Sequence, residues 1–331
     1  MKGVSPLIAE IILIAIVFSI ATAVIVVLGG VSFSVRTLDA KLGVDGFEWR
    51  SQRLVIHHLG GDIIRNAFLI RDGAFYWGDL VVKKSGREVE ALYPRLNGKR
   101  AEYLIYEDMD SPPLGVLKRS ALHLPENRWV RLTLSARENG QLEYILSPPP
   151  SSFVVEFQFW AGGGRGEGST WFYAYCGVTP ENENWPPAGG YVFAYNENSD
   201  KLEVWYGGER LAADNMHSIN DNRWHEARIV FDGMVIEMYL DNRLDNRIRY
   251  IDYKAANRKG KSLFGWGARA GGDNNEHRIR NLRMWVRGET WIDFSPGDVL
   301  EFEMKDPLVI GDAMTITYLP QNKLLYMNDI S

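Results

Sequence analysis

The sequence has one cysteine, Cys176, among its 331 residues, so no disulfide can form within the chain and its core must stabilise the fold. It also lacks an Asn-x-Ser/Thr acceptor, a phosphate loop and a zinc-spaced group of Cys and His. Basic residues are not in excess: 37 Lys and Arg stand against 42 Asp and Glu. We therefore expect no nucleic-acid partner, because such partners require a concentrated basic surface.

Aromatic residues, by contrast, are plentiful, at 12% of the chain with eleven Trp. Many of them lie in short apolar runs of the kind that form strands. Between residues 153 and 285 these runs follow one another closely, which predicts a β-sandwich. The predicted strands are Phe153 to Trp160, Thr170 to Tyr175, Tyr191 to Tyr195, Leu202 to Tyr206 and His225 to Phe231.

The N-terminal segment is the one long apolar run. From Leu7 to Leu28 its only charged residue is Glu10. As a helix this run would be about 33 Å long, enough to cross the hydrocarbon core of a bilayer. A carboxylate in that environment needs a partner. The sequence therefore predicts a membrane helix in which Glu10 either finds a partner or, being near the helix end, reaches the membrane interface.

The opening MKGVSPLIAEIILIAIVFSIATAVIVVLGG resembles the N-terminus of archaeal type IV pilins. The resemblance implies a leader over residues 1–3, cut by prepilin peptidase between Gly3 and Val4. It also implies that residues 4–42 form a helix that anchors the chain in the membrane or builds a filament core. Glu10 would then pair with the α-amino group of Val4 in a neighbouring subunit during assembly.

Two further regions resemble the β-domain of the same family. One contains the LxIxHxGGDxI pattern of residues 54–64, and the other contains the Gly311-Asp312 turn before a final strand. We therefore predict a discontinuous pilin-type β-domain over residues 43–106 plus 288–331. Residues 107–287 would be a domain inserted into it, since surface loops tolerate insertions. Trp129 to Leu134 and Leu142 to Leu146 are expected to be edge strands of this insert.

The insert resembles the concanavalin-like jelly rolls of L-type lectins and laminin-G modules. The resemblance rests on a WHxxxIxFDG strand, a turn and a strand ending in Leu-Asp, and on two glycine-rich stretches. In this sequence they are Trp224 to Gly233, Ile236 to Asp241, Leu263 to Gly272 and Gly189 to Phe193. The predicted fold is therefore mainly β, with an N-terminal hydrophobic helix, a small pilin-type domain and an inserted lectin-like sandwich.

The lectin resemblance implies a carbohydrate site made by an Asp-Gly pair before a strand and by several loops. Such sites use amide and carboxylate groups for sugar hydroxyls and an aromatic ring for the apolar sugar face. The matching polar positions are Glu167-Gly168, Gly189-Gly190, Asn196 or Asn198, and Asp273 with Asn274. The candidate rings are Trp171, Trp185 and Trp266, of which Trp185 lies in a predicted loop.

The sequence also bears on cofactors and catalysis. No acidic residue lies in Val192 to Tyr195, so the calcium–manganese site of legume lectins is not expected. The oxygen-rich run Asn196, Glu197, Asn198 and Asp200 is a candidate calcium site, and a solvated turn is the alternative. Glycoside hydrolases of this fold need two carboxylates, whereas the strand at residues 154–160 has Glu156 but Gln158. No catalytic residue is predicted.

Together these patterns predict an adhesive or minor pilin whose lectin-like domain binds glycans. Its partners would be the membrane, prepilin peptidase, other pilin subunits and a glycan. It would lie in the cell membrane with an extracellular head, or in an extracellular pilus. The alternatives are a surface receptor that does not polymerise, a structural pilin with a spacer domain that binds nothing, and a glycoside hydrolase.

Overall fold

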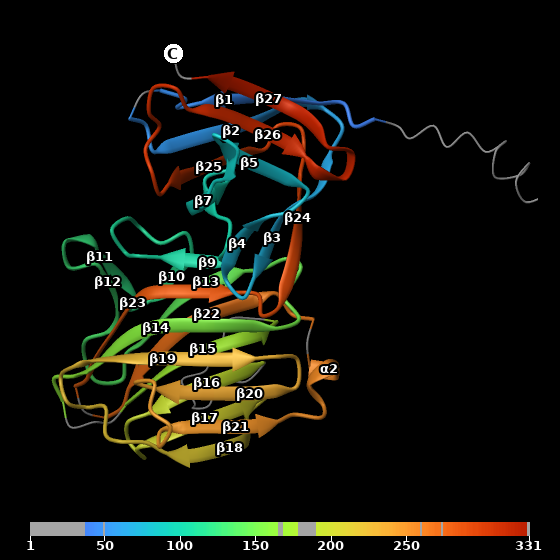
Figure 1. The fold of residues 1–331 in the computed structure, drawn as a ribbon. Coiled ribbons are helices and arrows are strands. Elements are labelled where there is room, and N and C mark those ends of the chain that lie inside the picture. The colour runs from blue at the N-terminus through green and yellow to red at the C-terminus, as the bar shows by residue number, and fades with distance from the viewer. Residues whose placement is uncertain are drawn as a thin grey trace, which may run out of the picture. The chain divides into compact units, whose positions relative to one another are not determined.

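The computed structural model describes residues 37–48, 50–164, 168–177, 190–258, 260–272 and 274–329. The chain divides into two compact units, Met1–Asp39 and Ala40–Ser331, and every element described below belongs to the second. This unit is mainly β, as predicted (Figure 1). In the described residues its helical elements are α2 (Ala255–Arg258) and two single 3-10 turns, η1 (Pro125–Asn127) and η2 (Leu319–Gln321).

The predicted membrane helix, with Gly3, Val4 and Glu10, lies outside the described residues. In the part of the chain that the structure describes, no helix is both long enough and apolar enough to cross a membrane.

Two antiparallel sheets form a sandwich. The first has seven strands in the order β10-β13-β22-β15-β16-β17-β18. Their bounds are β10 (Val116–Arg119), β13 (Asn139–Ile145), β22 (Leu263–Ala270), β15 (Gly168–Cys176), β16 (Tyr191–Asn196), β17 (Lys201–Tyr206) and β18 (Glu209–Asn215).

The second sheet has the order β11-β12-β23-β14-β19-β20-β21, and β9 also pairs with β23. Its strands are β9 (Ile105–Glu107), β11 (Leu122–Leu124), β12 (Trp129–Thr133), β14 (Phe153–Gly162), β19 (Trp224–Phe231), β20 (Val235–Leu240), β21 (Arg247–Ile251) and β23 (Glu276–Trp285). The predicted turn between β19 and β20 is confirmed, because Asp232 Oδ1 accepts the backbone N–H of Val235 at 2.8 Å.

The prediction that residues 129–134 and 142–146 form edge strands was wrong. β12 lies between β11 and β23, and β13 lies between β10 and β22. The short strands β10 and β11 provide the edges instead. They were missed because each has only three or four residues, too few for a clear alternating pattern.

Three smaller sheets use residues 40–100 and 289–329, so segments far apart in the sequence pair with each other. One has the order β1-β2-β25-β7-β8, the second β24-β3-β4 and the third β27-β26-β5-β6. Their strands are β1 (Ala40–Asp45), β2 (Arg53–Gly61), β3 (Ile64–Arg71), β4 (Ala74–Trp77), β5 (Leu80–Lys84), β6 (Arg87–Glu88), β7 (Ala91–Leu96), β8 (Lys99–Arg100), β24 (Glu289–Phe294), β25 (Val299–Met304), β26 (Ala313–Tyr318) and β27 (Lys323–Asp329). That these sheets form a pilin-type domain stays a prediction.

The core of the sandwich is rich in aromatic rings. Phe153 stacks on Phe231 of the same sheet with ring centroids 5.4 Å apart, and it makes a T-shaped contact with Phe172 of the other sheet. Trp266 is fully buried in the same core, so its predicted role as a sugar-covering ring was wrong. Cys176 is also buried, and burial raises the pKa of its thiol to about 12. The single cysteine is therefore a packing residue rather than a reactive thiol.

We expect Phe153→Ala to lower the free energy of unfolding by about 3–5 kcal/mol, because it removes a ring from the centre of the core and leaves a cavity. Tyr253→Ala is the control, since Tyr253 is 82% exposed and its loss should change stability by less than about 0.5 kcal/mol. Guanidinium chloride unfolding of both variants measures the difference. Equal stabilities would contradict the proposed role of the ring.

Candidate functional site

The outer face of the seven-stranded sheet carries an unusual set of side chains. Strand register places Gln141, Gly267, Trp171, Ala194 and Glu203 in one row across five strands. A Cβ atom on Gly267 would come within 2.7 Å of the Trp171 indole nitrogen. Glycine at this position therefore leaves room for the large Trp171 ring against the neighbouring strand.

At the β17 end of this row, a buried carboxylate organises three side chains. Glu203 is only 2% exposed, and its Oε2 accepts hydrogen bonds from Trp205 Nε1 at 3.0 Å and Asn196 Nδ2 at 3.3 Å. Arg210 Nη1 lies 3.4 Å from its other oxygen, and the Arg210 guanidinium also lies over the Trp205 ring, 5.7 Å from the centroid. Trp205 itself is half-buried. The cluster thus fixes a partly accessible indole beside an amide and a guanidinium.

A cavity of about 280 Å³ lies at the adjoining end of the same sheet. It is lined by Gly168, Ser169, Asn196, Asn198, Arg269, Gly271 and Gly272. Asn196 links this cavity to the Glu203 cluster, because its side chain takes part in both. The cavity thus presents hydroxyl, amide and guanidinium groups. Trp205 is not among its lining residues, because it pairs with Val192, four positions along β16 from Asn196.

The structure brings together several of the predicted carbohydrate positions. Gly168, Asn196 and the alternative Asn198 line the cavity. Asn274 follows the glycine loop by two residues, and its Oδ1 accepts the backbone N–H of Ala136 at 3.0 Å.

Other predicted positions are not brought to this cavity. Gly190 lies just before Tyr191, which pairs with Ala174, whereas Asn196 at the far end of β16 pairs with Ser169. Gly190 is therefore at the opposite end of the strand pair. Trp171 lies on the outer face but is only 2% exposed. The remaining predicted positions, Glu167, Trp185, Gly189 and Asp273, lie outside the described residues.

A buried polar network lies next to the cavity. Glu197 Oε1 is 2.6 Å from His277 Nε2, and Asn275 Nδ2 donates to the other oxygen of the same carboxylate. His277 Nδ1 is 2.6 Å from Thr133 Oγ1, which donates to the carbonyl of Asn275 at 2.9 Å. A Cβ atom on Gly168 would meet the His277 ring at 2.7 Å. Glycine at position 168 is therefore explained by packing against this network.

The same network bears on the candidate calcium run. The carboxylate of Glu197 faces His277 and Asn275 inside the fold. Asn196 Oδ1 accepts the backbone N–H of Asn198 at 3.1 Å, as in a polar turn. These two oxygen-bearing groups are already used within the protein.

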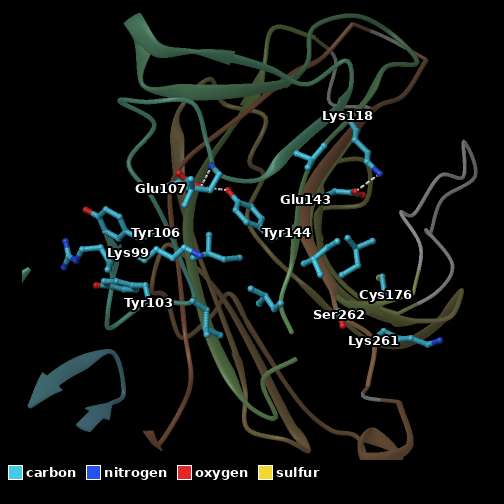
Figure 2. A pocket seen from close by; sticks show the side chains of 18 of the residues that line it. Lys99, Tyr103, Tyr106, Glu107, Lys118, Glu143, Tyr144, Cys176, Lys261 and Ser262 are labelled. Carbon is cyan, nitrogen blue, oxygen red and sulfur yellow. Dashed lines mark hydrogen bonds and ion pairs between the residues drawn. The ribbon is translucent and has the colours of Figure 1, made fainter. Parts of the chain in front are cut away.

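A larger cleft, of about 1050 Å³, opens beside β10 and β13 (Figure 2). Glu107 Oε1 in this cleft accepts hydrogen bonds from the backbone N–H of Leu114 at 2.7 Å and from Tyr144 Oη at 2.8 Å. Glu143 accepts Tyr173 Oη at 2.9 Å and pairs with Lys118 Nζ at 2.7 Å. Burial raises the pKa of Glu107, although both of its hydrogen bonds act in the opposite direction. Both carboxylates thus brace the wall of the cleft.

β14, the strand with Glu156 and Gln158, carries a set of polar contacts to neighbouring strands. Glu156 lies 3.5 Å from Arg228, and Gln158 donates to Glu226 at 3.3 Å. Gln158 also accepts the Nε–H of Arg280 at 2.8 Å. These groups form cross-strand pairs on the outer face of the eight-stranded sheet.

Glu203, Trp205 and Arg210 were not predicted from the sequence. The first two are separated by one residue in a strand, which places them on the same face. That spacing was visible in Leu202 to Tyr206, but it did not show which face was buried.

Comparison with known proteins identifies neither a matching family model nor a matching curated protein. Several solved lectin structures are similar to this chain. The metal-free carbohydrate recognition domain of Emp46p has a TM-score of 0.41 at 14% identity, covering 53% of this chain and 90% of that one. The Ca²⁺/Man3GlcNAc-bound exoplasmic/lumenal domain of VIP36 has a TM-score of 0.43 at 15% identity, covering 58% and 90%. The Lotus tetragonolobus seed lectin has a TM-score of 0.44 at 11% identity, covering 57% and 97%.

For the cleft, we expect Glu107→Ala to lower the free energy of unfolding by about 1–3 kcal/mol, because it leaves Tyr144 and the Leu114 N–H without an acceptor. Glu107→Gln keeps an acceptor and removes the charge, so it should be at least as stable as the wild type at pH 7. Chemical denaturation at several pH values measures both effects.

The pH dependence supplies the control for this prediction. Because the folded-state pKa of Glu107 is raised, its contribution to stability is complete below its ordinary pKa of 4.5 and is lost as pH rises through the raised value. Glu107→Gln should remove this loss. An unchanged pH dependence would show that Glu107 titrates normally.

Proposed function

We propose that this chain is a surface-displayed glycan-binding protein and that its sandwich holds the glycan at the end where the 280 Å³ cavity meets the Glu203 cluster. The observation that supports this is the double role of Asn196, which lines the cavity and bonds to the carboxylate that fixes Trp205. A sugar needs such neighbours, because one of its faces is apolar while its rim is made of hydroxyls.

The chemical roles follow from the groups present. Trp205 supplies an apolar surface, and its hydrogen bond to Glu203 holds the indole in one orientation. Ser169, Asn196 and Arg269 supply donors and acceptors from three neighbouring strands. Gly271 and Gly272 have no side chains, so a ligand can approach the backbone closely there. We assign the chain no catalytic residue.

We further propose that the head is displayed by an archaeal pilin-like N-terminus. This part rests on the sequence alone, through the Gly3-Val4 junction, the apolar run and Glu10. The chain would be anchored in the membrane or packed into a pilus with other subunits. One alternative is a surface receptor that has the same head and helix but does not polymerise. Another is a structural pilin whose head is a spacer that binds no glycan.

We expect the full-length chain to bind a subset of glycans on an array and Trp205→Ala to weaken that binding at least tenfold, about 1.4 kcal/mol. Trp205→Phe should weaken it less, because it keeps a ring but loses the N–H to Glu203. Trp291→Ala is the matched control, since Trp291 is exposed but belongs to β24. Binding that is unchanged in Trp205→Ala, or absent from the folded wild type, would support the spacer alternative.

The same array, repeated with a chelator and with added calcium, tests the metal dependence. We expect glycan binding to persist in the chelator, because Glu197 faces His277 and Asn275 rather than a shared cation position. Loss of binding in the chelator and its recovery with calcium would instead assign a calcium ion to the site.

The pilin part is tested separately, by N-terminal sequencing of the protein made in cells that contain a prepilin peptidase. We expect the mature chain to begin at Val4 and Gly3→Val to retain the leader, because the resemblance places the cut after a small residue. A wild-type chain that still begins at Met1 would refute this processing without bearing on glycan binding.

A further inference from the structure

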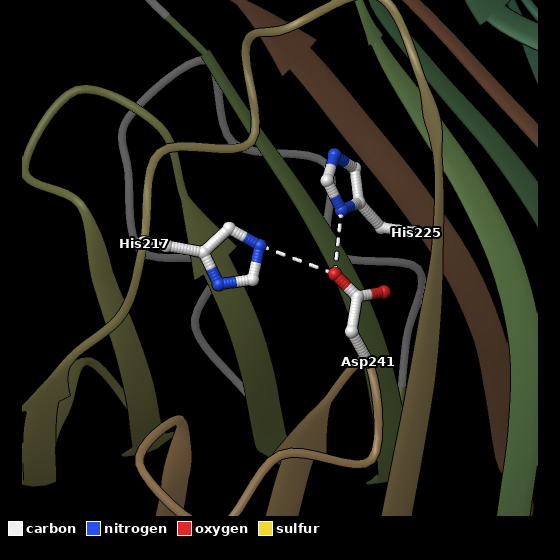
Figure 3. A group of neighbouring side chains, drawn as sticks. All are labelled: His217, His225 and Asp241. Atoms are coloured by element: carbon white, nitrogen blue, oxygen red, sulfur yellow. Dashed lines mark hydrogen bonds and ion pairs between the residues drawn. The ribbon is translucent and has the colours of Figure 1, made fainter.

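Two histidines and an aspartate from three separate segments meet on the sandwich (Figure 3). His217 lies between β18 and β19, His225 lies in β19, and Asp241 directly follows β20. His217 Nε2 is 3.1 Å from Asp241 Oδ2, and His225 Nδ1 is 2.9 Å from the same oxygen. In the described residues this is the one group of at least three His, Cys, Asp or Glu side chains with the spacing of metal ligands.

We propose that His217, His225 and Asp241 bind one divalent transition-metal ion, with zinc the ion that best suits them. Two imidazole nitrogens and a carboxylate oxygen form a common zinc ligand set, which leaves the fourth position to water. With bonds of about 2.0–2.2 Å in tetrahedral geometry, neighbouring ligand atoms lie about 3.3 Å apart. The two observed N–O distances, 2.9 and 3.1 Å, need to open by only a few tenths of an ångström, and all three ligand atoms lie within 4.8 Å of one another.

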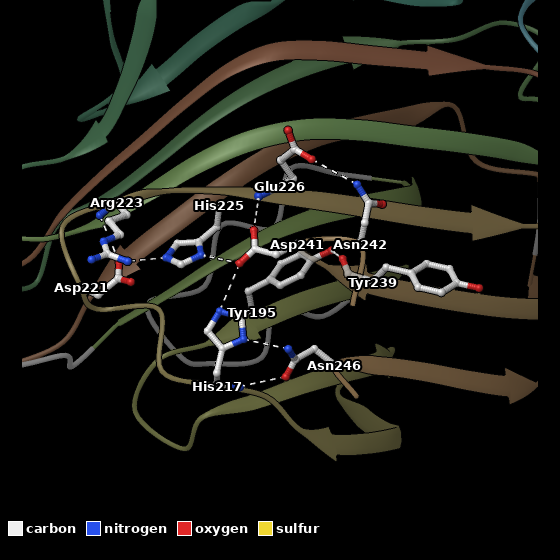
Figure 4. A network of polar contacts seen from close by, with 10 residues as sticks. All are labelled: Tyr195, His217, Asp221, Arg223, His225, Glu226, Tyr239, Asp241, Asn242 and Asn246. Atoms are coloured by element: carbon white, nitrogen blue, oxygen red, sulfur yellow. Dashed lines mark hydrogen bonds and ion pairs between the residues drawn. The ribbon is translucent and has the colours of Figure 1, made fainter. Parts of the chain in front are cut away.

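The surroundings of His225 and Asp241 suit a metal (Figure 4). Asp221 Oδ1 lies 3.0 Å from His225 Nε2, so a carboxylate would receive the N–H of a ring that binds metal through Nδ1. Asp241 Oδ1 accepts the backbone N–H of Glu226 at 2.8 Å, which fixes the carboxylate and leaves Oδ2 for the ion. Asp221 and the Glu226 backbone thus hold two of the three ligands in place.

The site is also open to the solvent. The side chains of His217 and Asp241 are 30% and 28% exposed, whereas that of His225 is 4% exposed. An ion can therefore enter from the side of His217, and water can occupy the remaining coordination position.

Asn246 influences how strongly His217, the third ligand, binds the metal ion. Its Oδ1 accepts the backbone N–H of His217 at 3.0 Å, so its Nδ2 donates to His217 Nδ1 at 2.8 Å. Nε2 of His217 then carries the proton that points at Asp241. A metal at Nε2 moves that proton to Nδ1, where Asn246 offers a donor rather than an acceptor. Asn246 therefore weakens metal binding, and an acceptor at position 246 strengthens it.

A bound ion would fasten the segment that contains His217 to the turn after β20. That segment already contacts the loop after β14, because Asn220 Nδ2 donates to the carbonyl of Gly164 at 3.2 Å and Asn222 Oδ1 accepts the N–H of Gly163 at 3.1 Å. The metal would brace these loops against one another, whether or not the sandwich binds a glycan.

The test is titration of the full-length, tag-free and metal-stripped chain with Co²⁺, followed by displacement with Zn²⁺. We expect one ion per chain with the strong visible absorption of four-coordinate cobalt, lost on addition of zinc. His217→Ala and Asp241→Asn should each weaken binding at least tenfold. His217 is chosen over His225 because its partial exposure makes its replacement less disruptive.

His57→Ala is the matched control, because His57 also pairs with an aspartate, Asp45, at 2.9 Å but belongs to no group of three ligands. The adjacent His58 lies on the opposite face of β2. It should bind cobalt as the wild type does. Asn246→Asp should bind at least tenfold more tightly, since it offers His217 Nδ1 an acceptor. A folded wild type that binds no cobalt, or binding that survives His217→Ala and Asp241→Asn, would overturn the proposal and leave the cluster as a hydrogen-bond network.

Discussion

The architecture of the sandwich depends on the packing of aromatic rings between its two sheets. Alternate residues of a strand point to opposite faces. Once Phe172 and Phe193 fill the interior, Trp171 and Ala194 must lie on the outer face of the same sheet. The core therefore determines which side chains are presented outward, and it places Glu203 and Trp205 in rows that cross five strands.

The same constraint explains how far the sequence could lead. The mainly β fold and the turn at Asp232 were evident, because alternation and turn residues are local signals. The sequence did not show which face of each strand was buried. Trp266 and Trp205 both sit in alternating strands, yet the first is in the core and the second is half-buried outside it. The buried and the half-buried tryptophan can be told apart only when it is known that β22 pairs with β13 and β15 and that β17 pairs with β16.

Loop residues were harder still to predict. Gly168 and Asn196 come together because β15 and β16 are antiparallel neighbours, and that same pairing sends Gly190 to the other end. His217, His225 and Asp241 occupy a loop, a strand and a turn, so no fixed spacing announces them as a group. Glu197 shows the same limit: its position in a polar run implied a solvated side chain, yet Asn275 and His277 hold it inside the fold.

The two sheets of the sandwich end in strands with charged side chains. β18 carries Glu209 and Asp214, and β21 carries the exposed Arg247 and Arg249. An open strand edge is a template on which another chain can extend the sheet, and charges along the edge oppose such pairing. Copies of this protein held close together would therefore resist cross-β aggregation, and their sheets would stay separate even at high local concentration.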